Sequence, residues 1–297
     1  MLMMVSAAAK IIESVRSTAS ERPVLGFALL SSALLGTILV ARRIKQPRIS
    51  QPYTRGLAPN ELMVRLPDGR RVVLASHGDP RGWPLFLFHG IPVSRLGHVF
   101  TDAPAKERGV RVLCPDRPGI GLSDPMPGRT VYGYADDVAA MADALGLERF
   151  AVAGLSGGGP YALACGAKLP ERVTAVGVMA GLGPLDRSGA REGLTKTDLR
   201  LLDYSLRRPL QARLMLGTMA TLTRLAPSVV IKQSADELGE PDRSFLQREK
   251  RELGSAGTMS ALVEAFRQGA SGPAEEYRLC GLPWGFALDE VRVPVWL

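Results

Sequence analysis

The sequence predicts an α/β protein with a mostly parallel sheet, a helical insertion and an N-terminal transmembrane helix. Three observations predict this fold. Short apolar runs of strand length alternate with segments of helical periodicity, residues 182–282 carry several helical patterns and no long strand pattern, and residues 24–41 contain no charged side chain. The alternation favours parallel strands, since these need crossover connections that are usually helices.

The first two strands are predicted as an antiparallel hairpin, because two apolar runs flank the turn Pro67-Asp68-Gly69-Arg70. The later runs are continuously apolar, as is typical of strands covered on both faces. A helix is predicted over residues 134–145, where Asp136 and Asp137 stand in a first turn that favours negative charge. The predicted strands cover residues 62–66, 71–75, 84–88, 111–114, 150–153, 173–180 and 291–297.

The segment between Gly181 and Gly281 reads differently from the rest of the chain. Its periodicity predicts helices, separated by Pro227, Pro241 and Gly257. Four side chains are candidates for an apolar pocket, although packing within the protein is the alternative: Met215, Met219, Leu222 and Leu225. The predicted helices are residues 199–207, 211–225, 242–253 and 259–268.

Residues 154–158 read Gly-Leu-Ser-Gly-Gly and lie between a predicted strand and a predicted helix. This context predicts a nucleophile elbow, a sharp turn that exposes the hydroxyl of Ser156 at the end of a strand. Gly154 and Gly158 are small enough to let the strand and the helix approach each other. The amide of Gly157, at a helix N-terminus, is placed to bind an oxyanion. An ordinary Gly-Ser turn is the alternative.

The chain resembles the α/β-hydrolase fold family, in its esterase-like and lipase-like serine branch with a helical cap. The resemblance rests on the hairpin, the His-Gly-x-Pro turn at residues 89–92, the Asp-Arg-Pro-Gly-x-Gly-x-Ser segment at residues 116–123 and the elbow, in this order, and it covers roughly residues 60–297. It implies that Ser156 is the nucleophile and that the backbone amides of Gly157 and Ile91 form the oxyanion hole. It also implies a small, apolar, ester-like substrate. An apolar turn residue is the alternative for Ile91, and Trp284 and Phe286 are expected to pack where the cap returns to the core.

The same resemblance implies a histidine base and a carboxylate that follow the nucleophile in the chain. The three histidines are His77, His89 and His98, and all of them precede Ser156. His77 is expected at the surface and His89 is expected to support its own loop, which leaves His98 as a remote candidate for the base. Asp186 is a candidate acid or a surface turn residue. The sequence therefore contains no recognisable catalytic histidine or acid.

Two explanations fit this incomplete triad. The sequence is expected to be a truncated version of a longer enzyme, because it stops within a predicted strand while the elbow is intact. The alternative is a non-catalytic, membrane-tethered binding protein. Other chemistry at the same serine, such as carbon–carbon bond hydrolysis or cofactor-free haloperoxidation, is a further alternative.

Residues 24–41 reach the lower limit of length for a membrane span, and the basic residues Arg42, Arg43, Lys45 and Arg48 follow at once. A buried soluble helix is the alternative, whereas a cleaved signal peptide fits poorly. The excess of basic residues after the span favours a cytoplasmic hydrolase domain. The predicted organisation is an amphipathic segment (1–22), a transmembrane anchor (23–42), a basic, proline-containing linker (43–60), the hydrolase core (61–181), the cap (182–282) and an incomplete return to the core (283–297).

Charge and cysteine content exclude several function classes. The formal net charge is +8, of which residues 1–60 supply +6, from eight Lys and Arg against Glu13 and Glu21. The hydrolase part is thus nearly neutral, which argues against a nucleic-acid partner and for basic residues that meet lipid headgroups. Cys114, Cys165 and Cys280 lack metal-ligand spacing and are expected as free buried thiols. No phosphate-binding or dinucleotide motif occurs, so neither a metal nor a cofactor is expected.

Overall fold

The structure is a computed structural model that describes residues 57–185, 187–226, 229–230, 236, 239–240, 244 and 256–297. Residues 57–297 form one compact unit. The predicted amphipathic segment and anchor, residues 43–56 of the linker, most of the predicted helix 242–253 and Asp186 lie outside the described residues. Within the residues that are described, no helix has both the length and the apolar character needed to cross a membrane.

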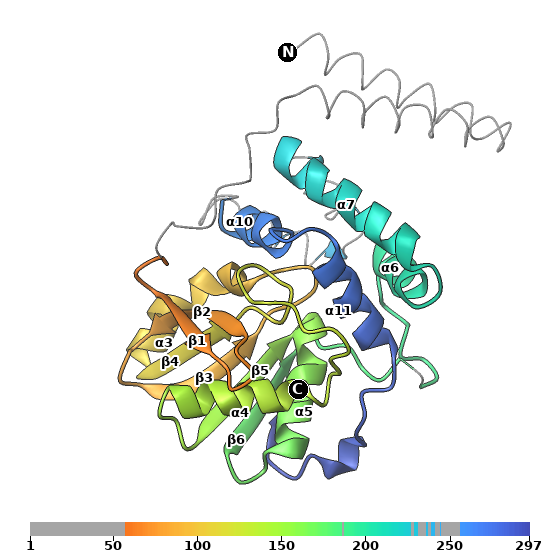
Figure 1. The fold of residues 1–297 in the computed structure, drawn as a ribbon. Coiled ribbons are helices and arrows are strands. Elements are labelled where there is room, and N and C mark those ends of the chain that lie inside the picture. The colour runs from red at the N-terminus through yellow and green to blue at the C-terminus, as the bar shows by residue number, and fades with distance from the viewer. Residues whose placement is uncertain are drawn as a thin grey trace, which may run out of the picture. The chain divides into compact units, whose positions relative to one another are not determined.

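A seven-stranded, mostly parallel sheet forms the centre of the unit (Figure 1), in the order β1-β2-β4-β3-β5-β6-β7. The β1–β2 and β2–β4 pairs are antiparallel, and the other pairs are parallel. The predicted hairpin is confirmed, with Val64 opposite Val72 across the Asp-Gly turn. The strands are β1 (Glu61–Arg65), β2 (Arg71–Gly78), β3 (Trp83–Phe88), β4 (Val110–Pro115), β5 (Phe150–Leu155), β6 (Val173–Met179) and β7 (Val295–Trp296).

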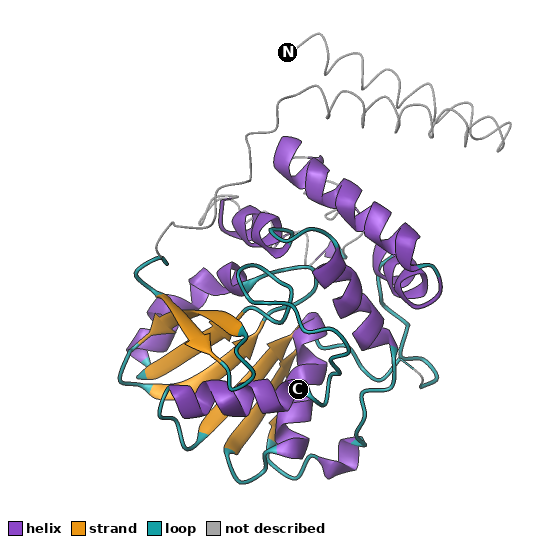
Figure 2. Ribbon diagram, viewed as in Figure 1, coloured by secondary structure: helices purple, strands orange, loops and turns teal. Residues whose placement is uncertain are grey.

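Helices cover the sheet (Figure 2). Four of the described helices, all from the predicted helical segment between Gly181 and Gly281, gather on one side of the sheet (Figure 1). These are α6 (Lys196–Arg207), α7 (Pro209–Leu225), α10 (Ala256–Ala265) and α11 (Ser271–Gly281). The remaining described elements are α3 (Asp102–Glu107), α4 (Tyr134–Ala144), α5 (Gly159–Lys168) and the 3-10 turns η1 (Arg95–Thr101), η2 (Ser156–Gly158) and η3 (Leu288–Glu290).

Aromatic side chains fill the contact between the sheet and the helices α4 and α5. Phe86 of β3 and Phe150 of β5 meet edge to face at 5.1 Å between ring centroids, and Tyr134 of α4 meets Tyr161 of α5 at 5.2 Å. All four side chains are buried. Such aromatic pairs add stabilising free energy beyond that expected from the apolar area that they bury. They hold α4 and α5 against the sheet that carries the elbow.

The predicted strand over residues 291–297 is wrong in its length. Only Val295 and Trp296 pair with β6, and the 3-10 turn η3 precedes them. The apolar side chains before them pack onto α5 instead: a Cβ atom at Gly166 would lie 3.1 Å from Cγ1 of Val291 and 3.2 Å from Cγ2 of Val293. An apolar run predicts burial, but it does not distinguish pairing in a sheet from packing on a helix.

Three further expectations have mixed outcomes. His77 is buried, not at the surface, because β2 continues to Gly78 and pairs His77 with Val112 of β4. Trp284 is buried and packs beside Phe286, as expected. Of the four pocket candidates on α7, Met215 and Met219 pack against the main core cluster, whereas Leu222 and Leu225 are exposed.

Candidate active site

Ser156 lies at the junction where β5 ends and the 3-10 turn η2 leads into α5. Its φ angle is 51°, in the left-handed region that a residue with a Cβ atom seldom adopts. A backbone held in this conformation is strained, and such strain is found at catalytic turns. The predicted sharp turn at Ser156 is therefore present.

Glycines on both sides of Ser156 make this turn possible. A Cβ atom at Gly154 would collide with the backbone carbonyl of Gly158, and a Cβ atom at Gly158 would collide with the carbonyl of Phe88 at the end of β3. Because these neighbours are backbone atoms, they have no alternative rotamer that would relieve the collision. The two glycines thus allow β3, β5 and α5 to converge on the serine.

We expect Gly158→Ala to lower the free energy of unfolding by about 1–3 kcal/mol, because overpacking of this kind forces backbone shifts. Gly217→Ala is the matched control, since a Cβ atom at Gly217 on α7 would meet nothing within 4 Å. Alanine favours a helix over glycine by about 1 kcal/mol, so this control is expected to be neutral or stabilising. Urea denaturation followed by circular dichroism measures both, and equal effects would contradict the role of Gly158.

The loop that follows β3 passes directly beside Ser156. A Cβ atom at Gly90 would lie 3.4 Å from Cβ and 3.9 Å from Oγ of Ser156. The Ile91 side chain packs against Gly157, where a Cβ atom would lie 2.6 Å from Cγ1 of Ile91. The structure therefore brings Ile91, Ser156 and Gly157 together at the carboxyl ends of β3 and β5.

His89 supports this loop, as expected. Its Nδ1 atom lies 2.8 Å from the carbonyl oxygen of Gly90, and its Nε2 atom accepts a hydrogen bond from the backbone amide of Arg117 at 3.4 Å. Both ring nitrogens are thus used within the loop region. Burial, together with the positive charge of Arg117, holds the pKa of His89 well below its ordinary value, so the imidazole is neutral.

The other two histidines lie on β2 and in η1. His77 on β2 has its Nδ1 atom 3.9 Å from Oδ1 of Asp102. His98 lies buried in η1, and Ser94, the residue just before η1, donates its hydroxyl to the carbonyl oxygen of Ala261 in α10. Burial lowers the pKa of His98 to about 4, helped by repulsion from His77 and Arg117. A group with so low a pKa is a weak general base near pH 7.

A buried ion network, which the sequence did not reveal, connects α11 to the loop beside Ser156. Glu276 of α11 is 1% exposed and accepts hydrogen bonds from Nε of Arg117, at 2.5 Å, and from Nη2 of Arg129. Arg117 in turn donates to the carbonyl oxygens of His89, at 2.6 Å, and of Gly90, at 3.3 Å. The guanidinium group of Arg117 therefore holds the backbone of the loop beside Ser156, and the carboxylate of Glu276 on α11 holds that guanidinium group.

A second network begins at the neighbouring residue. Asp116 is fully buried and accepts hydrogen bonds from Nη1 of Arg95, at 2.5 Å, and from the backbone amide of Arg95, at 2.7 Å. Arg95 also donates to Glu264 of α10 and to Glu61 of β1. Burial raises the pKa of Asp116 to about 6 against the opposing effect of Arg95. Asp116 is thus connected to α10 through Arg95 and Glu264, and Arg117 is connected to α11 through Glu276.

Cys280 of α11 also touches the elbow, with its thiol 3.8 Å from the carbonyl oxygen of Gly157. Burial raises the pKa of this thiol to about 12, so it is protonated and unreactive. Cys114 and Cys165 are likewise free and buried, as the sequence predicts. Among the described residues, no cluster of three or more His, Cys, Asp or Glu is arranged to hold a metal ion.

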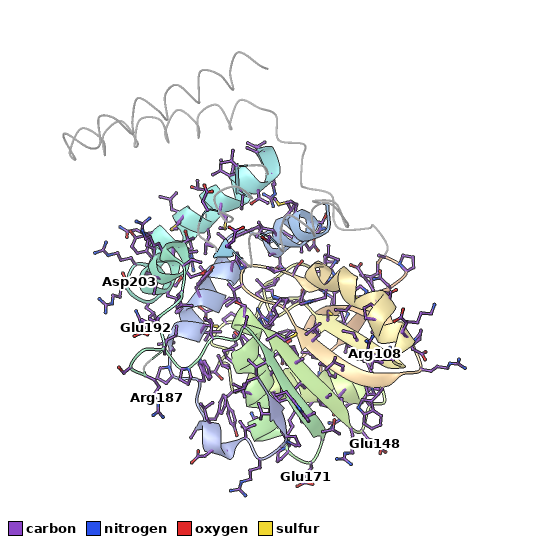
Figure 3. All side chains as sticks on the ribbon, turned by 180° about the vertical axis from the view of Figure 1, so that it is seen from behind. Arg108, Glu148, Glu171, Arg187, Glu192 and Asp203 are labelled. Atoms are coloured by element: carbon purple, nitrogen blue, oxygen red, sulfur yellow. The ribbon has the colours of Figure 1, made fainter. Side chains whose placement is uncertain are left out.

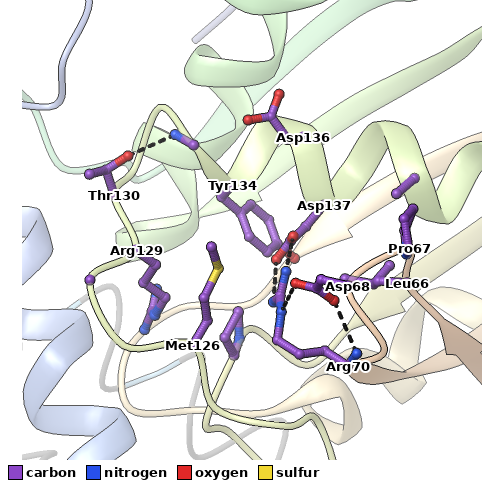
Figure 4. A pocket seen from close by; sticks show the side chains of 14 residues that line it. Leu66, Pro67, Asp68, Arg70, Met126, Arg129, Thr130, Tyr134, Asp136 and Asp137 are labelled. Carbon is purple, nitrogen blue, oxygen red and sulfur yellow. Dashed lines mark hydrogen bonds and ion pairs between the residues drawn. The ribbon is translucent and has the colours of Figure 1, made fainter.

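A pocket of about 350 Å³ lies away from the elbow, between the β1–β2 turn, the loop before α4 and α4 itself (Figure 4). Its charged groups are already paired: Arg70 donates to both carboxylate oxygens of Asp137, at 2.9 and 2.5 Å, and also binds Asp68. Neither Ser156 nor Ile91 lines it. The pocket is therefore separate from the candidate active site.

Comparison with known proteins agrees with this geometry. Residues 84–197 match a family model described as alpha/beta hydrolase fold. A 2-hydroxymuconate semialdehyde hydrolase of Pseudomonas putida is 31% identical over 123 residues, which are 39% of this chain and 44% of that protein. A non-heme chloroperoxidase of Streptomyces lividans is 32% identical over 124 residues, which are 41% of this chain and 45% of that protein. This chain thus spans about half the length of the curated relatives that it matches.

Solved structures support the same fold. The enol-lactonase of Burkholderia xenovorans LB400 superposes with a TM-score of 0.52 over 79% of each chain, at 18% sequence identity. At this level of identity the likeness concerns the fold alone.

Proposed function

This chain belongs to the α/β-hydrolase fold family, and we propose that it is a membrane-anchored serine hydrolase that acts on carboxylic ester-type substrates through Ser156. The observation that carries the proposal is the positive φ of Ser156 at the end of β5, directly beside the loop of Gly90 and Ile91. In the proposed site, the hydroxyl of Ser156 and the backbone amides of Gly157 and Ile91 act on one reacting carbonyl group.

In the proposed reaction, Oγ of Ser156 attacks the carbonyl carbon and forms a tetrahedral adduct. The negative charge that develops on the carbonyl oxygen accepts hydrogen bonds from the amides of Gly157 and Ile91. The hydrolysis also needs a base to take the proton of the serine hydroxyl and to return it to the leaving alcohol. None of the three histidines of this chain is proposed for that role.

Covalent labelling tests the assignment of the nucleophile. Long incubation with an excess of an alkyl fluorophosphonate is expected to give one adduct, which peptide mass spectrometry places on Ser156. Ser156→Ala is expected to remove the adduct, whereas Ser94→Ala, at a buried serine bound to Ala261, is expected to retain it. A label that maps elsewhere, or that survives Ser156→Ala, would contradict the assignment.

Carbon–carbon bond hydrolysis is the second candidate, because matched relatives of this region are named 2-hydroxymuconate semialdehyde hydrolases. The same serine and amides would act on a ketone or aldehyde carbonyl next to the bond that breaks. Competition separates the candidates: protection of Ser156 from labelling by 2-hydroxymuconate semialdehyde, and not by a short-chain ester, would favour this second function.

Membrane anchoring is proposed from the sequence alone, through the uncharged residues 24–41 and the basic cluster from Arg42 to Arg48. A cytoplasmic position of the hydrolase part is proposed from the excess of basic residues after the apolar run. Extraction tests the anchoring: the full chain is expected to stay in the membrane fraction at high pH and to leave it only with detergent.

A further inference from the structure

Helix α7 has an outward face that is apolar although it is exposed. Leu210, Leu214 and Leu225 are 78%, 54% and 69% exposed, and their spacing places them along one stripe of the helix. The opposite face is buried, through Ala212 and Leu216 among others. The inner face of the helix therefore packs within the protein. Its second, outward apolar face is not covered by any of the described residues.

The polar groups within this stripe are already satisfied. Thr218 donates its hydroxyl to the carbonyl of Leu214 at 3.0 Å, and Thr221 donates to the carbonyl of Gly217 at 2.9 Å. Threonine hydroxyls in a helix can bond back to the carbonyl of the preceding turn in this way. These two hydroxyl groups therefore do not depend on water for a hydrogen-bond partner, although the stripe is exposed to solvent.

The charges that helix α7 itself carries are all positive, and Arg207 just before it is paired with Asp203 at 3.3 Å. Residues 209–225 contain Arg213 and Arg224 and no acidic residue, and Arg207 and Arg208 precede them. Arg213 and Arg224 are exposed, and their spacing places both on one border of the leucine stripe, where Arg224 also donates one hydrogen bond to the carbonyl oxygen of Phe266 at 3.2 Å. An apolar stripe bordered by arginines is complementary to an anionic lipid surface, where leucines enter the acyl boundary and guanidinium groups meet phosphates.

We propose that α7 lies on an anionic bilayer surface, with Leu210, Leu214 and Leu225 inserted at the level of the headgroups. The chain itself supplies an independent reason to choose a bilayer as the occupant of this face, since residues 24–41 are uncharged and a basic cluster follows them. The proposal goes beyond the anchor and depends on different residues. At about 1.5 Å per residue, the 17-residue helix provides a contact of about 25 Å along the membrane.

Depth-sensitive fluorescence tests the proposal on the full chain, reconstituted in vesicles of phosphatidylcholine and phosphatidylglycerol. A polarity-sensitive fluorophore on Leu214→Cys is expected to shift to the blue and to be quenched several-fold more strongly by spin-labelled lipids than the same fluorophore on Glu148→Cys. Figure 3 shows Glu148 at the end of the sheet far from α6 and α7. The native cysteines are buried, so the unsubstituted chain gives the labelling background.

Two charge substitutions separate this contact from the anchor. In the Leu214→Cys chain, Leu210→Asp with Leu225→Asp is expected to abolish the lipid quenching while the protein still floats with the vesicles. Equal quenching at residues 214 and 148, or no quenching in a chain that floats, would overturn the proposal. A blue shift that appears without vesicles and grows with protein concentration would instead identify a second copy of the chain as the occupant, and it would overturn the proposal as well.

Discussion

Replacing Glu276 by glutamine is expected to lower the free energy of unfolding by about 3–5 kcal/mol, because removal of one partner from a buried ion network leaves uncompensated charge behind. Two guanidinium groups, those of Arg117 and Arg129, depend on this one carboxylate. All three side chains are almost completely buried, so water cannot take the place of the lost charge. The substitution preserves the shape of the side chain and therefore isolates the effect of charge.

Glu275→Gln is the matched control on the same helix. Glu275 pairs with Arg278 at 2.6 Å, but both side chains remain partly exposed, and surface pairs contribute about 0–1 kcal/mol. Urea denaturation of the detergent-solubilised full chain measures both substitutions. Similar losses for the two variants would contradict the role assigned to the buried network.

The effect of Glu276 is expected to depend on pH. Burial raises the pKa of Glu276, but the charges of Arg117 and Arg129 outweigh it and leave the pKa below the ordinary value of 4.5. A carboxyl group with a lowered pKa in the folded state contributes stability above its unfolded pKa and loses it as the pH falls through its folded pKa. The difference between the wild type and Glu276→Gln is therefore expected to be constant between about pH 6 and 8 and to shrink below about pH 4.5.

The same network is expected to affect the candidate active site. Arg117 holds the carbonyl oxygens of His89 and Gly90, so loss of its carboxylate partner frees the guanidinium group to reorient. The loop of Gly90 and Ile91 then loses its support beside Ser156. Slower fluorophosphonate labelling of Ser156 in Glu276→Gln than in Glu275→Gln, under conditions where both are folded, is the expected result.

The elbow was predictable from sequence because its requirements are local. Ser156 adopts a left-handed backbone conformation. Gly154 and Gly158 must lack a side chain, because a Cβ atom would collide with backbone atoms a few residues away or at the end of the next strand. The strand pattern before the serine and the helical pattern after it are likewise local. Local requirements leave a readable pattern in a single sequence, and both the elbow and the hairpin of β1 and β2 followed from such patterns.

The ion network was not predictable, because its partners are far apart in the chain. Arg117 and Glu276 are separated by 159 residues, and no spacing rule connects them. Helix α11 escaped prediction for a related reason. Its buried positions include the charged Glu276, so its inward face does not read as apolar, and only the arginines that meet it in the fold explain why a carboxylate is buried there.

Histidine burial shows the same limit. His77 follows the predicted end of its strand, and a polar residue at that place is usually exposed. In the structure, β2 continues to Gly78 and pairs with β4. The order of apolar and polar residues along one strand does not specify which other strand it pairs with. By contrast, His89 was correctly expected to support its loop, since it immediately follows the apolar run of β3 and precedes the turn beside the nucleophile.

The reactivity of Ser156 in this chain is expected to be roughly a million-fold below that of serine hydrolases with a complete triad, because removal of the base alone costs about as much as removal of all three members. His89 uses both ring nitrogens within its own loop and is held neutral, and burial leaves His98 with a pKa of about 4. In serine hydrolases that have lost a triad member, the oxyanion hole and substrate binding together retain a rate enhancement of about 10³–10⁴ over water, so slow but specific labelling of Ser156 is expected.

The second-order rate constant for fluorophosphonate labelling of the full chain measures this deficit. His98→Gln is the decisive variant: if His98 is not the base, its replacement leaves the slow rate of a folded protein unchanged. His77→Gln serves as the matched control, since His77 is also buried and has a lowered pKa for the same main reason, burial. Rapid labelling that depends on both Ser156 and His98 would show that a histidine preceding the nucleophile acts as the base, and the assignment of an incomplete triad would then be wrong.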